Sequence, residues 1–123
     1  MPPNILIVDD SAAIRKILQR VLKQSELPLG NLYEAGDGAQ ALDTLRANSV
    51  DLVLSDINMP NMDGLQLLAQ IKANPQWQGI RVVMITTEGS QARVMEAVEL
   101  GAAGYLRKPF TADQIKEKLL SLS

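Results

Sequence analysis

The sequence contains neither cysteine nor histidine. Without cysteine, the chain cannot form a disulfide framework, a thiolate zinc site or a thiol nucleophile. Without histidine, it lacks the commonest general base and the commonest metal ligand, and it has no phosphohistidine of its own. Any metal site in this protein must therefore use oxygen ligands, which favours a hard cation such as Mg²⁺.

Long hydrophobic runs and an excess of positive charge are also absent. No apolar run approaches the roughly 18 residues that a membrane-spanning helix needs, and residues 1–4 lack the basic and apolar layout of a signal peptide. The net charge of −2 provides no basic field for nucleic acid or acidic lipid. We therefore expect a cytoplasmic protein that has neither a nucleic-acid partner nor a membrane partner.

The remaining composition is ordinary for a globular protein, with 46% hydrophobic and 21% charged residues. A length of 123 residues predicts a single domain over residues 1–123. The basic residues Arg15, Lys16, Arg20 and Lys23 share one segment, which we interpret as the solvated face of a helix.

Five short apolar segments alternate with five segments of helical periodicity. The apolar segments, which we expect to form strands, are residues 5–8, 31–35, 50–55, 80–85 and 104–107. Because the third segment is nearly unbroken and β-branched, it predicts a strand that is buried on both faces. Strict alternation of this kind predicts an α/β fold, a parallel sheet with helices on both faces.

The helical segments carry apolar stripes. The first stripe consists of Ile14, Ile17, Leu18, Val21 and Leu22, which follow the helical spacing i, i+3, i+4, i+7 and i+8. The fourth helix, from about residue 90, places Val94, Ala97, Val98 and Gly101 on one face. Thr111 and Gln114 form a capping-box pattern that opens the last helix.

Polar residues stand where the predicted strands end. They are Asp9 and Asp10 after the first strand, Asp56 after the third, Thr86 after the fourth and Lys108 after the fifth. In a parallel α/β sheet the carboxyl ends of the strands share one edge, and ligands bind at that edge. These exits are therefore the leading candidates for a functional site.

Each residue also has an ordinary structural explanation. Asp9 or Asp10 can cap the first helix, and Asp56 can accept hydrogen bonds from loop amides. Thr86 can be a turn hydroxyl, and Lys108 can be a surface lysine. Their convergence on one edge of one sheet favours a shared site.

If the first and third strands are neighbours, three carboxylates meet in one pocket. At about 5 Å and an effective dielectric constant of about 20, each like-charged pair costs roughly 3 kcal/mol. Either one acid then stays protonated or a divalent cation binds. With only oxygen ligands available, Mg²⁺ is the natural occupant.

The sequence resembles the receiver domains of two-component response regulators, and among them the stand-alone chemotaxis regulators of the CheY type. The resemblance covers essentially the whole chain and rests on Asp9-Asp10, Asp56 with Met59-Pro60 and Asp63-Gly64, Thr86, and Lys108-Pro109-Phe110. It implies a flavodoxin-like doubly wound (βα)5 fold with a five-stranded parallel sheet in the order 2-1-3-4-5.

The resemblance also implies a phosphorylation site that depends on a metal. Asp56 would be the phosphoacceptor, its carboxylate attacking the phosphorus of a phosphohistidine on a partner kinase. Asp10 and Asp56 would bind Mg²⁺ directly, together with the main-chain carbonyl of Asn58. Asp9 would bind the ion through water.

The resemblance also implies a conformational switch that responds to the phosphoryl group. Lys108 would pair with the phosphoryl group, and the Thr86 hydroxyl would donate a hydrogen bond to it. Tyr105 would follow Thr86 inward and reshape the face made by the fourth helix, fifth strand and fifth helix. Asn58 and Glu88 would modulate dephosphorylation.

The expected function is therefore a phosphorylation-activated signalling switch rather than an enzyme with a separate substrate. It would catalyse only its own phosphoryl transfer and autodephosphorylation. Its partners would be a histidine kinase and a downstream target protein, such as a flagellar motor switch or another chemotaxis component. A phosphorelay intermediate, which passes the phosphoryl group to another histidine, remains an alternative of the same class.

Two alternatives belong to other classes. A Mg²⁺-dependent phosphohydrolase with an aspartate nucleophile typically has Asp-x-Asp after the first strand, whereas this chain has Asp9-Asp10, and Asp56 is followed two residues later by Asn58. A flavin-binding domain needs a hydroxyl- and glycine-rich phosphate loop after the first strand. Two acids at that position would repel phosphate.

Overall fold

The computed structural model describes residues 2–86, 91–108 and 110–122. At its centre is a five-stranded parallel sheet in the order β2-β1-β3-β4-β5. The strands are β1 (Ile5–Val8), β2 (Leu32–Ala35), β3 (Leu52–Asp56), β4 (Arg81–Thr86) and β5 (Gly104–Arg107). The predicted α/β class and the strand order 2-1-3-4-5 are confirmed.

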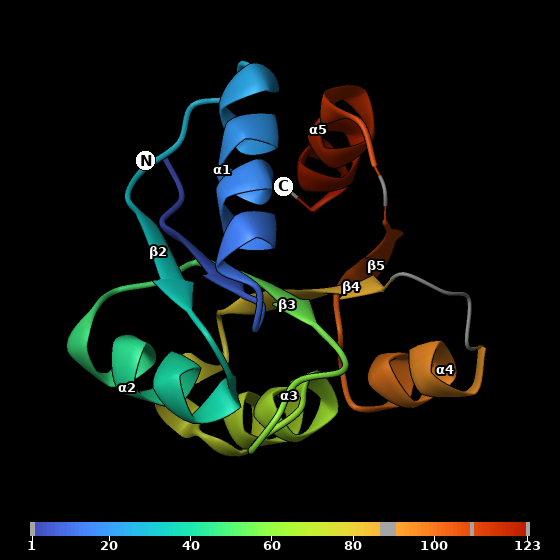
Figure 1. The fold of residues 1–123 in the computed structure, drawn as a ribbon. Coiled ribbons are helices and arrows are strands. Elements are labelled where there is room, and N and C mark those ends of the chain that lie inside the picture. The colour runs from blue at the N-terminus through green and yellow to red at the C-terminus, as the bar shows by residue number, and fades with distance from the viewer. Residues whose placement is uncertain (1, 87–90, 109, 123) are drawn as a thin grey trace.

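Helices connect successive strands and cover both faces of the sheet (Figure 1). They are α1 (Ala12–Gln24), α2 (Gly38–Ala47), α3 (Gly64–Ala73), α4 (Gln91–Glu99) and α5 (Ala112–Ser121), with a short 3-10 turn, η1 (Pro75–Trp77). Helices α1 and α5 lie on one face, and α2, α3 and α4 lie on the other (Figure 1). Among the described helices, none is long and apolar enough to cross a membrane.

The apolar core is divided by the sheet into two clusters. Side chains that alternate along the central strands point to opposite faces, so Leu6 and Val8 join one cluster while Ile5 and Ile7 join the other. Every residue of β1 is buried, whereas three of the four residues of β2 are only partly buried. This contrast is expected of a central strand and an edge strand in a sheet with two covered faces.

The boundaries of three strands differ from the predicted ones, and β2 begins at Leu32 rather than at residue 31. β3 spans Leu52–Asp56 rather than residues 50–55, and β4 spans Arg81–Thr86 rather than residues 80–85. The ladders continue through the polar residues, since Asp56 pairs with Ile85 and Thr86 pairs with Arg107. Asp56 and Thr86 are therefore the last residues of their strands, which fixes their backbones in the sheet.

Two predicted apolar stripes were too wide. Ile17 is 50% exposed because it lies at the edge of the α1 stripe, whose buried residues are Leu18 and Leu22. On α4, Ala97 is buried but Val98 is 51% exposed, so this helix contacts the core through a narrow strip. Gly101 lies beyond the end of α4, with a φ of +102°. The capping box at Thr111 and Gln114 is confirmed.

The start of α3 packs closely against the end of β3. The Gly64 amide donates to the Ile57 carbonyl at 2.8 Å. A Cβ at Gly64 would meet the Asp56 carbonyl oxygen and would lie 2.9 Å from the Ile57 Cα. Glycine is therefore required here for close approach, and it holds α3 directly beside Asp56.

Candidate functional site

The pairing of β1 with β3 brings the first two acids together. Val8 is paired with Ser55 in adjacent parallel strands, so the residues that follow them, Asp9 and Asp56, emerge side by side at the carboxyl edge. Carboxylate oxygens of Asp9, Asp10 and Asp56 lie within 4.8 Å of one another. The predicted gathering of the three acids is thus present in the structure.

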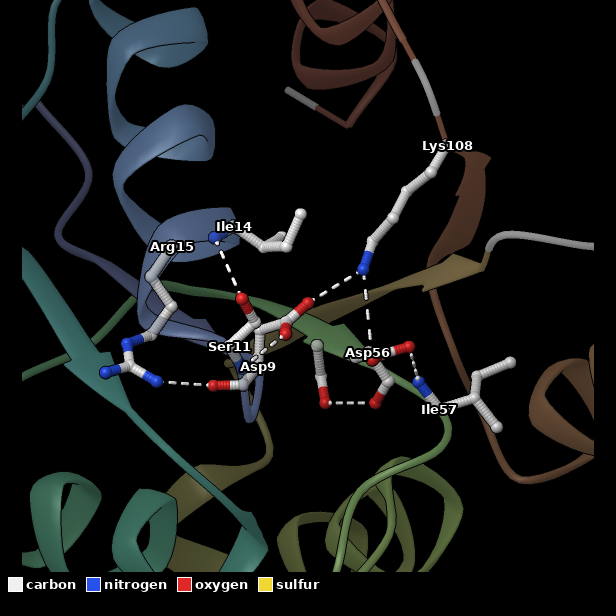
Figure 2. A network of polar contacts seen from close by, with 8 residues as sticks. Asp9, Ser11, Ile14, Arg15, Asp56, Ile57 and Lys108 are labelled. Atoms are coloured by element: carbon white, nitrogen blue, oxygen red, sulfur yellow. Dashed lines mark hydrogen bonds and ion pairs between the residues drawn. The ribbon is translucent and has the colours of Figure 1, made fainter.

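Lys108 reaches into this acidic cluster from the end of β5 (Figure 2). Its Nζ lies 2.7 Å from Asp9 Oδ2 and 3.8 Å from Asp56 Oδ2. The Lys108 amide also donates to the Thr86 carbonyl at 2.6 Å, which continues the β4–β5 ladder by one bond. Because its side chain is only 14% exposed, the interpretation of Lys108 as a surface lysine is wrong.

Asp9 is held by hydrogen bonds at the start of α1. Its Oδ1 accepts from the Ser11 amide at 2.9 Å, and its main-chain carbonyl accepts from the Arg15 guanidinium at 2.6 Å. The N-cap of α1 is Ser11, whose hydroxyl accepts from the Ile14 amide. The alternative in which Asp9 or Asp10 is the N-cap of α1 is therefore wrong, because Ser11 holds that position, and Asp9 instead accepts from the amide of the cap residue.

Arg15 is a supporting residue that the sequence interpretation missed. Its Nε donates to Glu34 on β2 at 3.0 Å, and its side chain is only 18% exposed. Arg15 therefore joins the edge strand to the backbone of Asp9 and does not belong to a solvated basic face. The available signal was its position four residues after Ser11, on the first turn of α1, facing a strand that carries Glu34.

The carboxylate of Asp56 is oriented by its own loop. Oδ1 accepts from the Ile57 amide at 2.8 Å, which leaves Oδ2 facing Lys108 (Figure 2). Burial raises the pKa of Asp56, the Lys108 ammonium opposes this rise, and the negative charge of Asp9 adds to it. The outcome is a pKa above 3.8, its ordinary value.

The other predicted site residues occupy different settings. Asp10 is the exposed member of the acidic cluster, Asn58 is exposed in the loop after Asp56, and Thr86 is buried at the end of β4. Tyr105 is 48% exposed on β5, where it pairs with Met84. Glu88 lies outside the described residues.

The loop that follows Asp56 is anchored to α2. Asn61, at a φ of +67°, donates from its side chain to Asp37 Oδ2 at 2.9 Å. The Met62 carbonyl accepts from the Gly38 amide at 3.1 Å. The hydrogen bond from the Gln40 amide, and then the one from Asn61, lower the pKa of Asp37. The loop that carries Asn58 is therefore fixed at a second point, which sequence spacing alone did not indicate.

The raised pKa of Asp56 predicts a pH-dependent stability difference. A carboxyl whose pKa is higher in the folded protein than in the unfolded chain destabilises the fold once it ionises. This cost is absent when the pH is well below 3.8, the ordinary pKa of the carboxyl, and it is fully present when the pH is above the folded pKa. In metal-free buffer at pH 7, Asp56→Asn should therefore have a larger free energy of unfolding than the wild type, as measured by urea denaturation.

The difference between the two proteins should disappear as the pH falls through the folded pKa and below the unfolded value. Asp43→Asn is a suitable control because Asp43 is highly exposed and pairs with Arg46 on the helix surface. A wild type that is more stable than Asp56→Asn at pH 7 would contradict the electrostatic interpretation of the cluster.

Comparisons with known proteins agree with this geometry. Residues 5–120 match the family described as response regulator receiver domain. The chain is 43% identical to chemotaxis protein CheY-3 of Vibrio cholerae over 116 residues, which cover 94% of this chain and 88% of that protein.

Solved structures give the same result. The crystal structure of chemotaxis protein CheY4 of Vibrio cholerae superposes with a TM-score of 0.88 at 29% identity, with both chains fully covered. A chain of the CheX-CheY-BeF3-Mg²⁺ complex from Borrelia burgdorferi superposes with a TM-score of 0.88 at 29% identity, covering 99% of this chain and 90% of that one. This chain therefore belongs to the response regulator receiver domains and is similar to the chemotaxis proteins of the CheY type.

Proposed function

We propose that this protein is a phosphorylation-activated signalling switch in which Asp56 accepts a phosphoryl group from a histidine kinase. The single observation that carries the proposal is the convergence of Asp9, Asp10, Asp56 and Lys108 on one edge of the sheet. Family membership supports the general role, since receiver domains are signalling modules.

The acidic cluster fits a magnesium ion. All of its donor atoms are oxygen, and Mg²⁺ prefers about six oxygens at roughly 2.1 Å, so that two bound oxygens lie at most about 4.2 Å apart. The carboxylate oxygens, within 4.8 Å of one another, need only a small closure to meet this condition. Asp10, Asp56 and the Asn58 carbonyl would hold the ion, and Asp9 would hold it through water. When bound, Mg²⁺ would neutralise oxygens of the transferring phosphoryl group.

The nucleophile in this proposal is Asp56 Oδ2. The hydrogen bond from the Ile57 amide occupies Oδ1, so Oδ2 is the oxygen that faces the open cluster. A bond forms between Oδ2 and the phosphorus while the bond between phosphorus and the kinase imidazole nitrogen breaks, and the electron pair leaves with the imidazole. No proton has to be removed from Asp56, because its carboxylate form is the nucleophile.

Lys108 would stabilise the product. Its ammonium group lies 3.8 Å from Asp56 Oδ2, close enough to pair with a phosphoryl oxygen after a small shift. Its shorter contact, 2.7 Å to Asp9, keeps it in the site before phosphorylation. Hydrolysis returns the carboxylate, and we assign the modulation of that step to Asn58 and Glu88.

Thr86 and Tyr105 would transmit the change. Tyr105 pairs with Met84, two residues before Thr86, so the alternation of a strand directs both side chains to the same side of the sheet. A Thr86 hydroxyl drawn toward the phosphoryl group would leave space into which the half-exposed Tyr105 ring can move. The face made by α4, β5 and α5 would then change shape.

This face also has the chemistry of a protein-binding surface. Four large apolar side chains are exposed on or beside α4 and β5: Met95, Val98, Leu100 and Tyr105. The exposure of several large apolar side chains on these elements supports a protein partner. We propose a downstream target of the chemotaxis type, supported by the CheX-CheY-BeF3-Mg²⁺ complex to which this chain is structurally similar.

Labelling with acetyl phosphate tests the proposed phosphoacceptor. In the presence of Mg²⁺, the wild type should gain one phosphoryl group by intact-mass spectrometry, and Asp56→Asn should gain none because the amide is not a nucleophile. Asp51→Asn, an aspartate beside the opposite end of β3, should be labelled like the wild type. EDTA should abolish labelling of the wild type. Labelling that persists in Asp56→Asn would move the phosphorylation site elsewhere.

The role of Thr86 can be isolated by a matched pair of substitutions. Thr86→Ser keeps the hydroxyl, and Thr86→Ala removes it. At saturating beryllofluoride and Mg²⁺, the change in the Tyr105 amide chemical shift should be similar to wild type in Thr86→Ser and at least about threefold smaller in Thr86→Ala, because only the hydroxyl can bond the phosphoryl mimic. Equal changes in both variants would remove Thr86 from the switch.

A further inference from the structure

Helix α4 is held by few apolar contacts. Among its described side chains only Ala97 is buried, while Met95 and Val98 are largely exposed. Little apolar area is therefore removed from water when α4 packs on the rest of the molecule, and elements of this kind have low local stability. A polar contact at its inner face consequently has a large share in fixing its position.

That polar contact is made by Arg93. Its Nη2 lies 3.4 Å from Oδ2 of Asp63, which is the N-cap of α3, and both side chains are partly buried. The Arg93 Nε is buried and has no hydrogen-bond partner among the described residues. A buried donor without a partner costs free energy, and the charge pair with Asp63 offsets part of the cost of burying the guanidinium.

The two oxygens of Asp63 have different partners. Oδ1 accepts from the Gln66 amide at 2.9 Å, and the Gln66 side chain accepts from the Asp63 amide at 3.0 Å, which completes a capping box. Because Oδ1 is engaged in capping, only Oδ2 faces Arg93. The ion pair is therefore a single long contact rather than a bidentate one, which explains why Nε lacks a partner.

Asp63 is also connected to the end of β3. The next residue, Gly64, donates its amide to the Ile57 carbonyl at 2.8 Å, and Ile57 in turn donates its amide to Asp56 Oδ1. A short series of contacts thus leads from Asp56 through Ile57 and the start of α3 to Arg93. This series does not include Thr86 or Tyr105.

We propose that Arg93 is a positioning residue that ties α4 to the loop after Asp56 through its ion pair with Asp63. The pair sets the resting position of α4, and a shift of the loop is passed to α4 directly. The second part rests on the proposed function, because it requires phosphorylation to move the loop. The first part concerns the resting protein alone.

Hydrogen exchange of the α4 amides tests the first part. Asp63→Asn keeps the cap, because asparagine caps helices as well as aspartate does, but it loses the charge. Arg93→Gln loses the charge at the other end. In each variant the amide hydrogens of residues 94–99 should exchange about two- to fivefold faster than in the wild type. This factor corresponds to about 0.4–1 kcal/mol, the range of partly exposed ion pairs. The double variant should exchange no faster than the faster single variant, because both remove the same interaction.

Salt and a second ion pair provide the controls. In 1 M NaCl the ratio of the α4 exchange rates of each variant and the wild type should approach one. Salt screens a charge pair but does not affect the packing of the Arg93 side-chain stem. Arg46→Gln, which removes an exposed ion pair with Asp43 on α2, should leave α4 exchange unchanged. The proposal would be overturned if α4 exchange were unchanged in Asp63→Asn and Arg93→Gln. It would also be overturned if the two substitutions had strictly additive effects on the exchange rates, or if the rate ratios did not respond to salt.

Beryllofluoride with Mg²⁺ tests the transmitted shift. Loading should change α4 exchange in the wild type, and in Arg93→Gln this change should be at least twofold smaller at saturating beryllofluoride. An equal change in the variant would overturn the second part of the proposal. A wild type in which α4 does not respond would count against the proposed function, whereas the resting measurement still decides whether Arg93 positions α4.

Discussion

The mutual repulsion of three carboxylates at the carboxyl edge of the sheet is the interaction on which the account of the site depends. Asp9, Asp10 and Asp56 bring their oxygens within 4.8 Å of one another, and Lys108 is the ammonium group that contacts two of them. Three negative charges and one positive charge leave an excess of two negative charges when all groups are ionised. A divalent cation matches this excess, and burial together with Asp9 already raises the pKa of Asp56 in its absence. In the proposed function, the unfavourable electrostatics of the resting site would make it receptive to a metal and then to a metal-bound phosphoryl group.

The fold maintains this arrangement because the acids are fixed to regular elements. Asp56 is the last residue of β3 and Asp9 follows β1, so the ladder between two buried central strands sets the spacing of the two carboxylates. Supporting hydrogen bonds then fix the surrounding loops: Ser11 and Arg15 hold Asp9, and Asn61 joins the loop after Asp56 to α2. Like charges held in this way cannot relax apart. Rigid placement of the repelling groups is thus as important as their identity.

Much of this arrangement could be predicted from the sequence, because it depends on patterns that a strand imposes locally. Apolar runs alternate with helical periodicity, and acids end two of those runs, so the fold class and the meeting of Asp9, Asp10 and Asp56 follow from the rules of parallel sheets. Contacts between elements could not be predicted in this way. Ser11 rather than Asp9 or Asp10 caps α1, Ile17 and Val98 lie outside the buried strips, and Arg15 turns inward, each because of how neighbouring elements pack. The ion pair between Asp63 and Arg93 joins residues 30 positions apart, and no periodic pattern relates them.

The dependence of stability on Mg²⁺ tests the central claim most directly. The free energy of unfolding at pH 7 should be measured against Mg²⁺ concentration for the wild type and for Asp10→Asn. An ion that binds only the folded chain stabilises it by about 2.7 kcal/mol at 100 times its dissociation constant, so the wild type should gain stability steadily as Mg²⁺ rises. Asp10→Asn should start more stable without metal and should respond much less. A wild type whose stability stays flat as Mg²⁺ enters the millimolar range, or an Asp10→Asn variant that is less stable than wild type in metal-free buffer, would contradict the claim that unrelieved carboxylate repulsion defines this site.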